Sequence, residues 1–347
     1  GDVYKRQILG IGTLLVVLLA MTLFLKFAPN GKVSLQALSG AACASFLPEA
    51  FLKYAIGGVL HLEYFIKLGE IAGSLSGVAV GILTCLKFGI NPVFAVLTGL
   101  VLYDFKLLPA FIAAYIVGFG IKAIEKYVPE GLDLIVVILV SPALAYGVAS
   151  LVSPSVIAVL KQIGSAVTAV GDNNPYALAL VIGAIVPVVG MTPLSSMVFT
   201  SLLGLTGIPM AIGALGCMGS SFANFVLFKK LKIGNSGKAF AVAIEPLTQI
   251  DIIAKYPIQL YGTNAIVGMV NGLFITYMGI VVNQPGMATP IAGPIVALGF
   301  NDALRTAITI VVVAIISILL SYIISTFISK KRLTFNVHTP QLKQQTS

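Results

Sequence analysis

Long apolar stretches, separated by short polar connections, occupy most of this sequence. Runs close to the roughly 20 residues that cross a bilayer recur along the chain, and the clearest cover residues 8–25, 71–85, 134–152, 265–282 and 307–328. These runs do not alternate between polar and apolar positions, which excludes a membrane-spanning barrel. Because lipid offers no partner to backbone polar groups, the spanning segments must be helices. The pattern predicts an all-α, polytopic membrane protein with about 8–10 membrane helices.

The apolar pattern is continuous, without a linker rich in proline or serine and without a long soluble segment. We therefore expect a single membrane domain over residues 8–329, followed by a tail over residues 330–347 that is first basic and then polar. The chain begins "GDVYKRQ" without methionine, and we expect residues 1–7 to be a truncated or non-native start. A soluble catalytic domain would have to come from another chain.

Composition and charge agree with a membrane location. Of the 347 residues, 58% are hydrophobic and 10% are charged, and the mean hydropathy is +1.03; an average soluble domain is roughly half apolar and about 25% charged. The formal charge of +9 arises at the ends of apolar runs, so we expect membrane lipid and not nucleic acid as a partner. The positive-inside rule makes "FKKLKIGNSGK" and residues 330–332 cytoplasmic.

Charged residues in the first half and the cysteines and histidines predict no site. Glu49 and Lys53 have the spacing of an ion pair on one helix, which favours a helix at the membrane interface. Asp104 and Lys106 fall between two apolar stretches, which favours a turn near the membrane surface. The three cysteines and two histidines show no metal-ligand spacing, so we expect no metal, no cofactor and no disulfide framework.

Three segments of the second half repeat a helix-breaking pattern: "VGMTPLSS" over residues 189–196, "VAIEPLTQ" over 242–249 and "GMATPIAG" over 286–293. Proline removes a helical hydrogen bond and disfavours helical geometry at the preceding residue. In a membrane, such backbone is tolerated only inside protein or beside water, and broken helices commonly form the substrate sites of transporters. We expect re-entrant or broken helices that line a polar site; the alternative is a set of simple proline kinks.

Glu245 is the first candidate for that site, because an ionisable residue within a membrane segment is costly and is a functional candidate by default. Its carboxylate would accept hydrogen bonds from hydroxyl groups, and neighbouring polar side chains add donors and acceptors. Asp251 could be a second ligand, a helix cap or an interfacial residue. The further candidates on the three segments are Thr248, Gln249, Thr192, Ser195 and Thr289.

Two further polar clusters could complete the site. "GDNNPYAL" predicts a helix start with Asn174 as its cap, and the additional polar residues before it leave room for a ligand contact. "GCMGSSFANF" places Ser220, Ser221 and Asn224 within about one helical turn. Small residues of this kind favour close helix packing, and asparagine often bonds across helices. We therefore favour packing for this cluster and keep Asn174 and Asn224 as candidate ligands.

The same segments carry a family resemblance. Through "GDNNPYALALVIGAIVPVVGMTPLSS", "GALGCMGSSFAN" and "AIEPLTQIDIIAKYPIQLYGTNA", nearly the whole chain after residue 7 resembles the membrane subunit, enzyme IIC, of bacterial phosphoenolpyruvate-dependent sugar phosphotransferase systems. It looks most like the stand-alone branch that includes the perfringolysin O regulator, PfoR. The resemblance implies a sugar permease of the bacterial cell (inner) membrane, multi-pass, homodimeric, with cytosolic phosphotransferase subunits as partners.

In the glucose-type enzyme IIC family, a glutamate in a G-[IV]-[TS]-E-P loop binds the sugar. Glu245 and Pro246 match its last two positions, whereas Ile244 stands in place of the hydroxyl residue, no glycine precedes it, and the accompanying membrane histidine has no counterpart. The resemblance therefore implies a sugar or related polar solute at Glu245, with any phosphorylation supplied by separate subunits and no catalytic residue in this chain. Two alternatives remain: a membrane sensor that regulates gene expression, and an ion-coupled transporter that uses Glu245 and Asp251 for protons or cations.

Overall fold

The computed structural model describes residues 1–170 and 173–336, and for residues 201–202 and 330–336 only the course of the backbone. The described residues form helices and connecting loops and contain no β-strand. Seven of these helices are long and apolar enough to cross a membrane, or eight if one bent pair is counted as a single span. The expected all-α, polytopic architecture is therefore confirmed, with a span count at the lower edge of the expected range.

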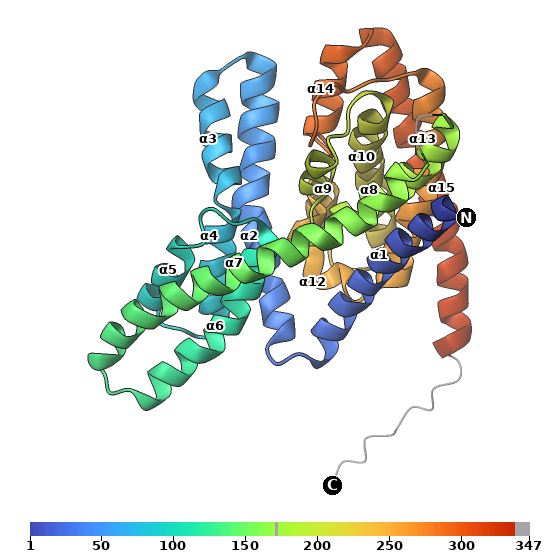
Figure 1. The fold of residues 1–347 in the computed structure, drawn as a ribbon. Helices are drawn as coiled ribbons and strands as arrows, with labels where there is room; N and C mark the ends of the chain where they lie inside the picture. The colour runs from blue at the N-terminus through green and yellow to red at the C-terminus, as the bar shows by residue number, and fades with distance from the viewer. Residues whose placement is uncertain (171–172, 337–347) are drawn as a thin grey trace.

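The first group of helices is coloured blue to green in Figure 1. Its core is a layer of α2, α4 and α6, with α3 packed against η1 and α5 packed between α4 and α7. The bounds are α1 Asp2–Phe27, α2 Gly31–Pro48, the π-helix η1 Glu49–Gly58, α3 Glu63–Ser74, α4 Ser76–Lys87, α5 Pro92–Leu100, α6 Leu107–Tyr127 and α7 Leu132–Thr168.

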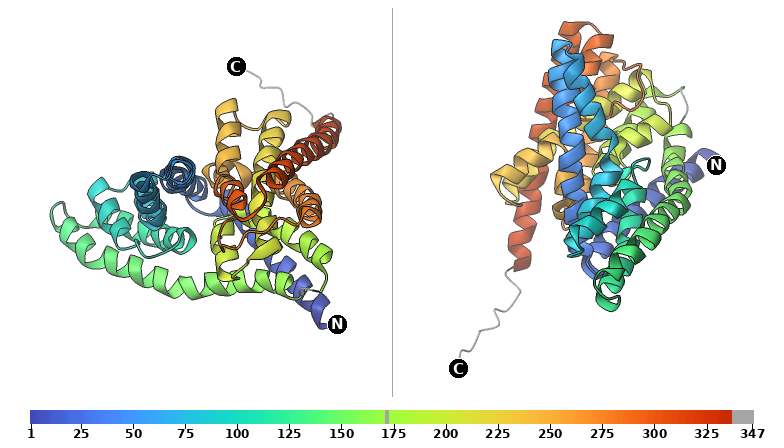
Figure 2. Two further views of the ribbon diagram at one scale, coloured as in Figure 1. Left: turned by 90° about the horizontal axis from the view of Figure 1, so that it is seen from above. Right: turned by 90° about the vertical axis from the view of Figure 1, so that its left-hand side faces the viewer.

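The second group contains the yellow to red helices on the other side of the molecule (Figure 2). Its centre is α10, which contacts α8, α11, α13, α14 and α15. The bounds are α8 Pro175–Gly190, α9 Ser196–Leu202, α10 Gly207–Lys230, α11 Ser236–Ile244, the 3-10 helix η2 Pro246–Gln249, α12 Ile250–Ile253, the π-helix η3 Ile258–Gly262, α13 Thr263–Met278, α14 Ala292–Phe300 and α15 Ala303–Asn336.

The groups touch at several places, including a contact of η1 with α14, and two connections are the most extensive. The long helix α7 runs across both groups, and α1 packs along it (Figures 1 and 2), so closely that a Cβ on Gly10 would lie only 2.6 Å from the Cβ of Ala166. The second connection is the packing of η2 and α12 against α2. There the Ser39 hydroxyl donates a hydrogen bond of 3.1 Å to the carboxylate of Asp251. The first group thus contacts the helix break next to Glu245 directly.

Close backbone packing holds the centre of the second group together. Gly183 of α8 and Gly268 of α13 face each other, and a Cβ on either glycine would overlap the carbonyl oxygen of the other. Only glycine permits this approach, as is common where membrane helices cross. Because lipid tails are as apolar as leucine, such packing and the hydrogen bonds between helices, rather than exclusion of water, hold the bundle together.

The expected breaks in the second half are confirmed. Helix α8 ends at Gly190, α11 ends at Ile244, and residues 279–291 are non-helical before α14 begins. The last break is a re-entrant hairpin, because Asn301 accepts a hydrogen bond of 2.9 Å from the Val281 amide and donates one of 2.7 Å to the Val281 carbonyl. These two bonds bring the ends of the excursion together and leave its middle inside the bundle.

The first half is less regular than its sequence suggested. The expected span over residues 71–85 is bent by 50° between α3 and α4, and α2 continues into a π-helix. A row of glycines at every fourth position accompanies this distortion. Gly69 and Gly73 pack against Lys53 and Glu49 of η1, and Gly77 packs on the loop after α5. The small-residue spacing was the available signal for this close packing.

Candidate functional site

A small pocket lined by polar and apolar side chains lies where the three proline segments meet, and we call it the inner pocket. Its volume is about 20 Å³, which is room for roughly one water molecule. The first segment contributes Ser195 and Ser196, the second contributes Glu245, and the third contributes Thr289. The remaining wall comes mainly from α10 and from Phe46 of α2. Segments separated by about 50 residues each in the sequence therefore share one cavity.

Glu245 sits at the tip between α11 and η2. Its backbone is extended, with φ −149° and ψ 111°, and it begins η2 directly before Pro246. One carboxylate oxygen accepts a long hydrogen bond of 3.4 Å from the Leu247 amide. No lysine or arginine among the described residues lies within 4.0 Å of it. A partly buried carboxylate in this position retains free acceptor capacity that points to a ligand with donors.

The other candidates on the second segment stabilise the segment from α11 through η2 to α12, which we call the Glu245 hairpin. Thr248 donates a hydrogen bond of 2.7 Å to the Glu245 carbonyl, and the amide of Gln249 donates one of 3.4 Å to the Thr248 hydroxyl. Asp251 accepts its hydrogen bond from Ser39 of α2. None of these three residues lines the inner pocket. Their contacts position Glu245 and attach the hairpin to α2.

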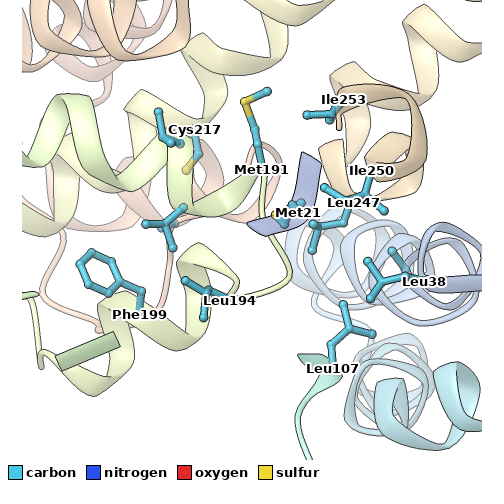
Figure 3. Packing of buried hydrophobic residues seen from close by; sticks show 14 of the residues in the cluster. Met21, Leu38, Leu107, Met191, Leu194, Phe199, Cys217, Leu247, Ile250 and Ile253 are labelled. Carbon is cyan, nitrogen blue, oxygen red and sulfur yellow. The ribbon is translucent and has the colours of Figure 1, made fainter. Parts of the chain in front are cut away.

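This attachment is also apolar. Leu247 and Ile250 of the hairpin are buried together with Leu38 of α2, and Figure 3 shows the three side chains close to one another. The contact places Phe46, two helical turns further along α2, in the wall of the inner pocket. The first group of helices therefore closes a pocket whose polar residues belong to the second group.

Thr192 and Asn174 have local partners instead of pocket positions. The Thr192 hydroxyl is buried, donates 2.7 Å to the Val189 carbonyl and accepts 3.2 Å from the Leu194 amide, so it shapes the turn after α8. Asn174 accepts a hydrogen bond of 3.1 Å from the Ala177 amide and caps α8. Asn174 therefore has the geometry of the helix cap that the sequence predicted. Asp172, in the same polar cluster, lies outside the described residues.

Asn224 lies beneath the pocket in a closed hydrogen-bond network. Ser220 donates 2.6 Å to the side-chain oxygen of Asn264, Asn264 donates 2.7 Å to the oxygen of Asn224, and Asn224 donates 3.4 Å back to Ser220. All three are buried. Asn224 thus packs between helices, as its sequence favoured, whereas Ser220 also faces the pocket. Asn264, which sequence reasoning missed, orients Ser220.

Several pocket residues were not among the sequence-based candidates. Ser196 donates a hydrogen bond of 2.7 Å to the Ala288 carbonyl and so ties the first proline segment to the third. Cys217 lies 3.8 Å from the Ser196 hydroxyl. Ser221 lines the pocket, and its buried hydroxyl has no partner among the described residues. Ser220 makes the interhelical hydrogen bond that the packing interpretation of "GCMGSSFANF" favours, and helix α10 also turns Ser220 and Ser221 toward the pocket.

A second, larger cavity of about 830 Å³ adjoins the inner pocket, and we call it the outer cavity. Glu49 and Lys53 of η1 and Asp104 and Lys106 of the loop before α6 line it. Asp104 lies in a turn, as expected, and Asp104 and Lys106 are exposed; the sequence did not indicate that this turn and η1 line one cavity. The pair α3–α4 is bent by 50°; α3 packs on η1 through Gly69 and Gly73, and the loop after α5 packs on Gly77 of α4, an arrangement that no local pattern shows.

Fold and cavities together define a polytopic membrane protein in which broken helices enclose a polar pocket. Residues 33–339 match the family described as "Phosphotransferase system, EIIC". The match covers most of the chain, which therefore belongs to this family, the membrane component of phosphotransferase sugar transport. No curated protein and no solved structure shows significant similarity to the chain.

Proposed function

We propose that this protein is a permease for a sugar or a related polyhydroxylated solute, and that Glu245 binds the solute. The observation that carries the proposal is the position of Glu245 at a break where all three proline segments meet, with most of its acceptor capacity unused by the described residues. A carboxylate accepts hydrogen bonds from sugar hydroxyls, and such charge-assisted bonds are about twice as strong as neutral ones. The serine hydroxyls of the pocket supply both donors and acceptors.

The small volume of the inner pocket indicates how the solute would enter. A sugar ring is far larger than one water molecule, so the pocket must widen for binding. Phe46 belongs to the first group of helices, and Glu245, Ser196 and Thr289 belong to the second. A displacement of one group relative to the other would widen the pocket without unfolding either group. Such movement of one body against another is the usual basis of alternating access.

The direction of the helices supports a cytoplasmic C-terminus. Gly219 of α10 faces Ser317 of α15, and the Lys230 amine lies 3.9 Å from the centre of the Tyr322 ring. The two helices therefore run in the same direction, and the basic residues at their ends lie on one side of the bundle. The positive-inside rule assigns that side to the cytoplasm, where separate phosphotransferase subunits would act on the bound sugar.

The remaining features of the proposal rest on resemblance. The segments around Asn174, Ser220 and Glu245 favour the PfoR branch of the family, and the family suggests a homodimer. A regulatory role would use the same solute pocket and pass a signal to a cytoplasmic partner. Solute uptake that requires a phosphoryl donor would support the permease, and a change in gene expression without uptake would support the sensor.

The test is ligand-induced stabilisation of the purified protein. Glucose, N-acetylglucosamine, maltose, cellobiose and sorbitol are added separately, and thermal unfolding is measured for the wild type, Glu245→Gln and the control Glu130→Gln, which changes an exposed loop carboxylate. A ligand at about 100 times its Kd stabilises the folded state by about 2.7 kcal/mol. We expect this stabilisation to be reduced in Glu245→Gln and kept in full in the control. A panel in which no compound stabilises the wild type would refute the proposal.

A further inference from the structure

The outer cavity gathers charged side chains that the inner pocket does not use. Glu49 and Lys53 belong to a helix that is a candidate membrane span, and Glu70 belongs to the bent pair α3–α4. Asp104 and Lys106 complete the cluster from the loop before α6. Ionisable residues in membrane segments are costly, and they usually face a water-filled path or a substrate. Three such residues from two candidate spans, together with two charged residues of the loop, make this cavity a functional candidate.

The cluster is held in place by helix packing. The Lys53 amine lies 3.5 Å from the Glu70 carboxylate, and Gly69 and Gly73 bring α3 against the stems of Lys53 and Glu49. Glu49 also interacts electrostatically with Lys106. Since the side chains of Lys53 and Glu70 remain 29% and 54% exposed, their polar ends are available to a solute in the cavity.

The two cavities differ in volume, and this difference suggests different roles for them. The inner pocket holds about 20 Å³ and the outer cavity about 830 Å³. Sites for small molecules commonly have volumes of about 300–1,000 Å³, so the outer cavity accommodates a sugar as it stands. Phe46, Ser195 and Met197 line both cavities. These three residues form the common wall.

We propose that the outer cavity is a second binding site for the same polyhydroxylated solute, at which Lys53 and Glu70 contact its hydroxyl groups before it passes Phe46 to reach Glu245. This inference rests on the proposed function. Ammonium groups donate to hydroxyl oxygens and carboxylates accept from hydroxyl hydrogens, so a paired cation and anion recognise a neutral polyol without favouring an ion. The aromatic ring of Phe46 separates the two sites in the closed arrangement.

A single tryptophan tests this site, because the chain contains no tryptophan of its own. Tyr103 lines the outer cavity, does not line the inner pocket and is 59% exposed. The Tyr103→Trp reporter is titrated with each compound that stabilises the wild type. We expect a saturable change in fluorescence. In the Glu245→Gln background the apparent affinity should stay within about twofold, as independent sites require.

The decisive variant combines Lys53→Met with Glu70→Gln in the reporter, so that no unpaired charge remains. Loss of charge-assisted hydrogen bonds should raise the apparent Kd obtained from the fluorescence titration about tenfold or more. The matched control combines Glu63→Gln with Lys67→Met on the exposed face of the same helix, α3, and should leave the response unchanged. Thermal unfolding without solute checks that all variants fold alike.

The outcomes distinguish the two proposals. A reporter that stays silent while the wild type is stabilised, or that loses its response with Glu245→Gln, overturns the second site and leaves the proposed function standing. Equal loss in the Glu63 and Lys67 control also overturns it, because the effect would then not belong to the cavity. If none of the compounds stabilises the wild type, the proposed function fails and this inference fails with it.

Discussion

Replacement of Asn264 by alanine should remove the hydrogen bonds that hold Ser220 in place at the inner pocket. Asn264 makes three hydrogen bonds: it accepts from Ser220 at 2.6 Å and donates to Asn224 at 2.7 Å and to the Leu260 carbonyl at 2.8 Å. Hydrogen bonds between membrane helices contribute about 0.6 kcal/mol each on average. The bonds to Ser220 and Asn224 join helices, whereas the bond to Leu260 lies within one span, so loss of the two interhelical bonds should lower the free energy of unfolding by about 1 kcal/mol.

Asn271 provides a matched control on the same helix, α13. It is also buried, but its side chain donates a single hydrogen bond, of 2.9 Å to Ser317, and its oxygen has no partner among the described residues. Asn271→Ala removes the same atoms as Asn264→Ala and should cost about 0.6 kcal/mol from hydrogen bonding. The difference between the two variants therefore isolates the bonds of the network from the cavity that each substitution creates.

Unfolding can be followed with a thiol-reactive dye, because Cys85 and Cys217 are buried and become accessible when the protein unfolds. Cys43 is exposed and is replaced by serine to lower the background. Solute affinity is measured in parallel by stabilisation. Because Ser220 loses its acceptor, we expect affinity about three- to tenfold weaker in Asn264→Ala and unchanged in Asn271→Ala. Equal stability and equal affinity in the two variants would refute the role of the network.

Two further substitutions test the barrier that Phe46 forms between the cavities and the role of Asn174 as a helix cap. Phe46→Ala should join the cavities, so Cys217, which is buried in the inner pocket, should react faster with a small thiol reagent while Cys85 reacts as before; an unchanged rate for Cys217 would argue against a barrier at Phe46. Asn174→Ala removes the cap of α8 and should cost about 1 kcal/mol of stability without a change in solute affinity. A loss of affinity beyond the loss of stability would instead make Asn174 a ligand.

Local chemistry accounts for what could be predicted of the site. The repeated pattern of Thr or Glu before Pro predicted the breaks near Thr192, Glu245 and Thr289, because proline removes a helical hydrogen bond and disfavours helical geometry at the preceding residue; Pro142 and Pro154, by contrast, lie inside the continuous helix α7. A carboxylate beside such a break had to face a polar environment. The roles of Thr248 and Asn224 could not be assigned in this way, because a hydroxyl or amide group takes either a local partner or a ligand. Their partners are visible only after the chain has folded.

Sequence by itself determined that this chain is an all-helical membrane protein with helix breaks at three proline segments. Its composition and the length of its apolar runs indicate that the segments lie in lipid, and lipid requires spanning segments of this kind to be helices. Only the tertiary structure decided that the three interruptions share one pocket, that α2 closes it with Phe46, and that Glu49 and Lys53 face a second cavity. These features depend on the contact of η2 with α2 and of α3 with η1. The first contact joins residues far apart in the chain and the second joins two consecutive helices, and the periodicity of a single helix carries no information about which helix packs against it.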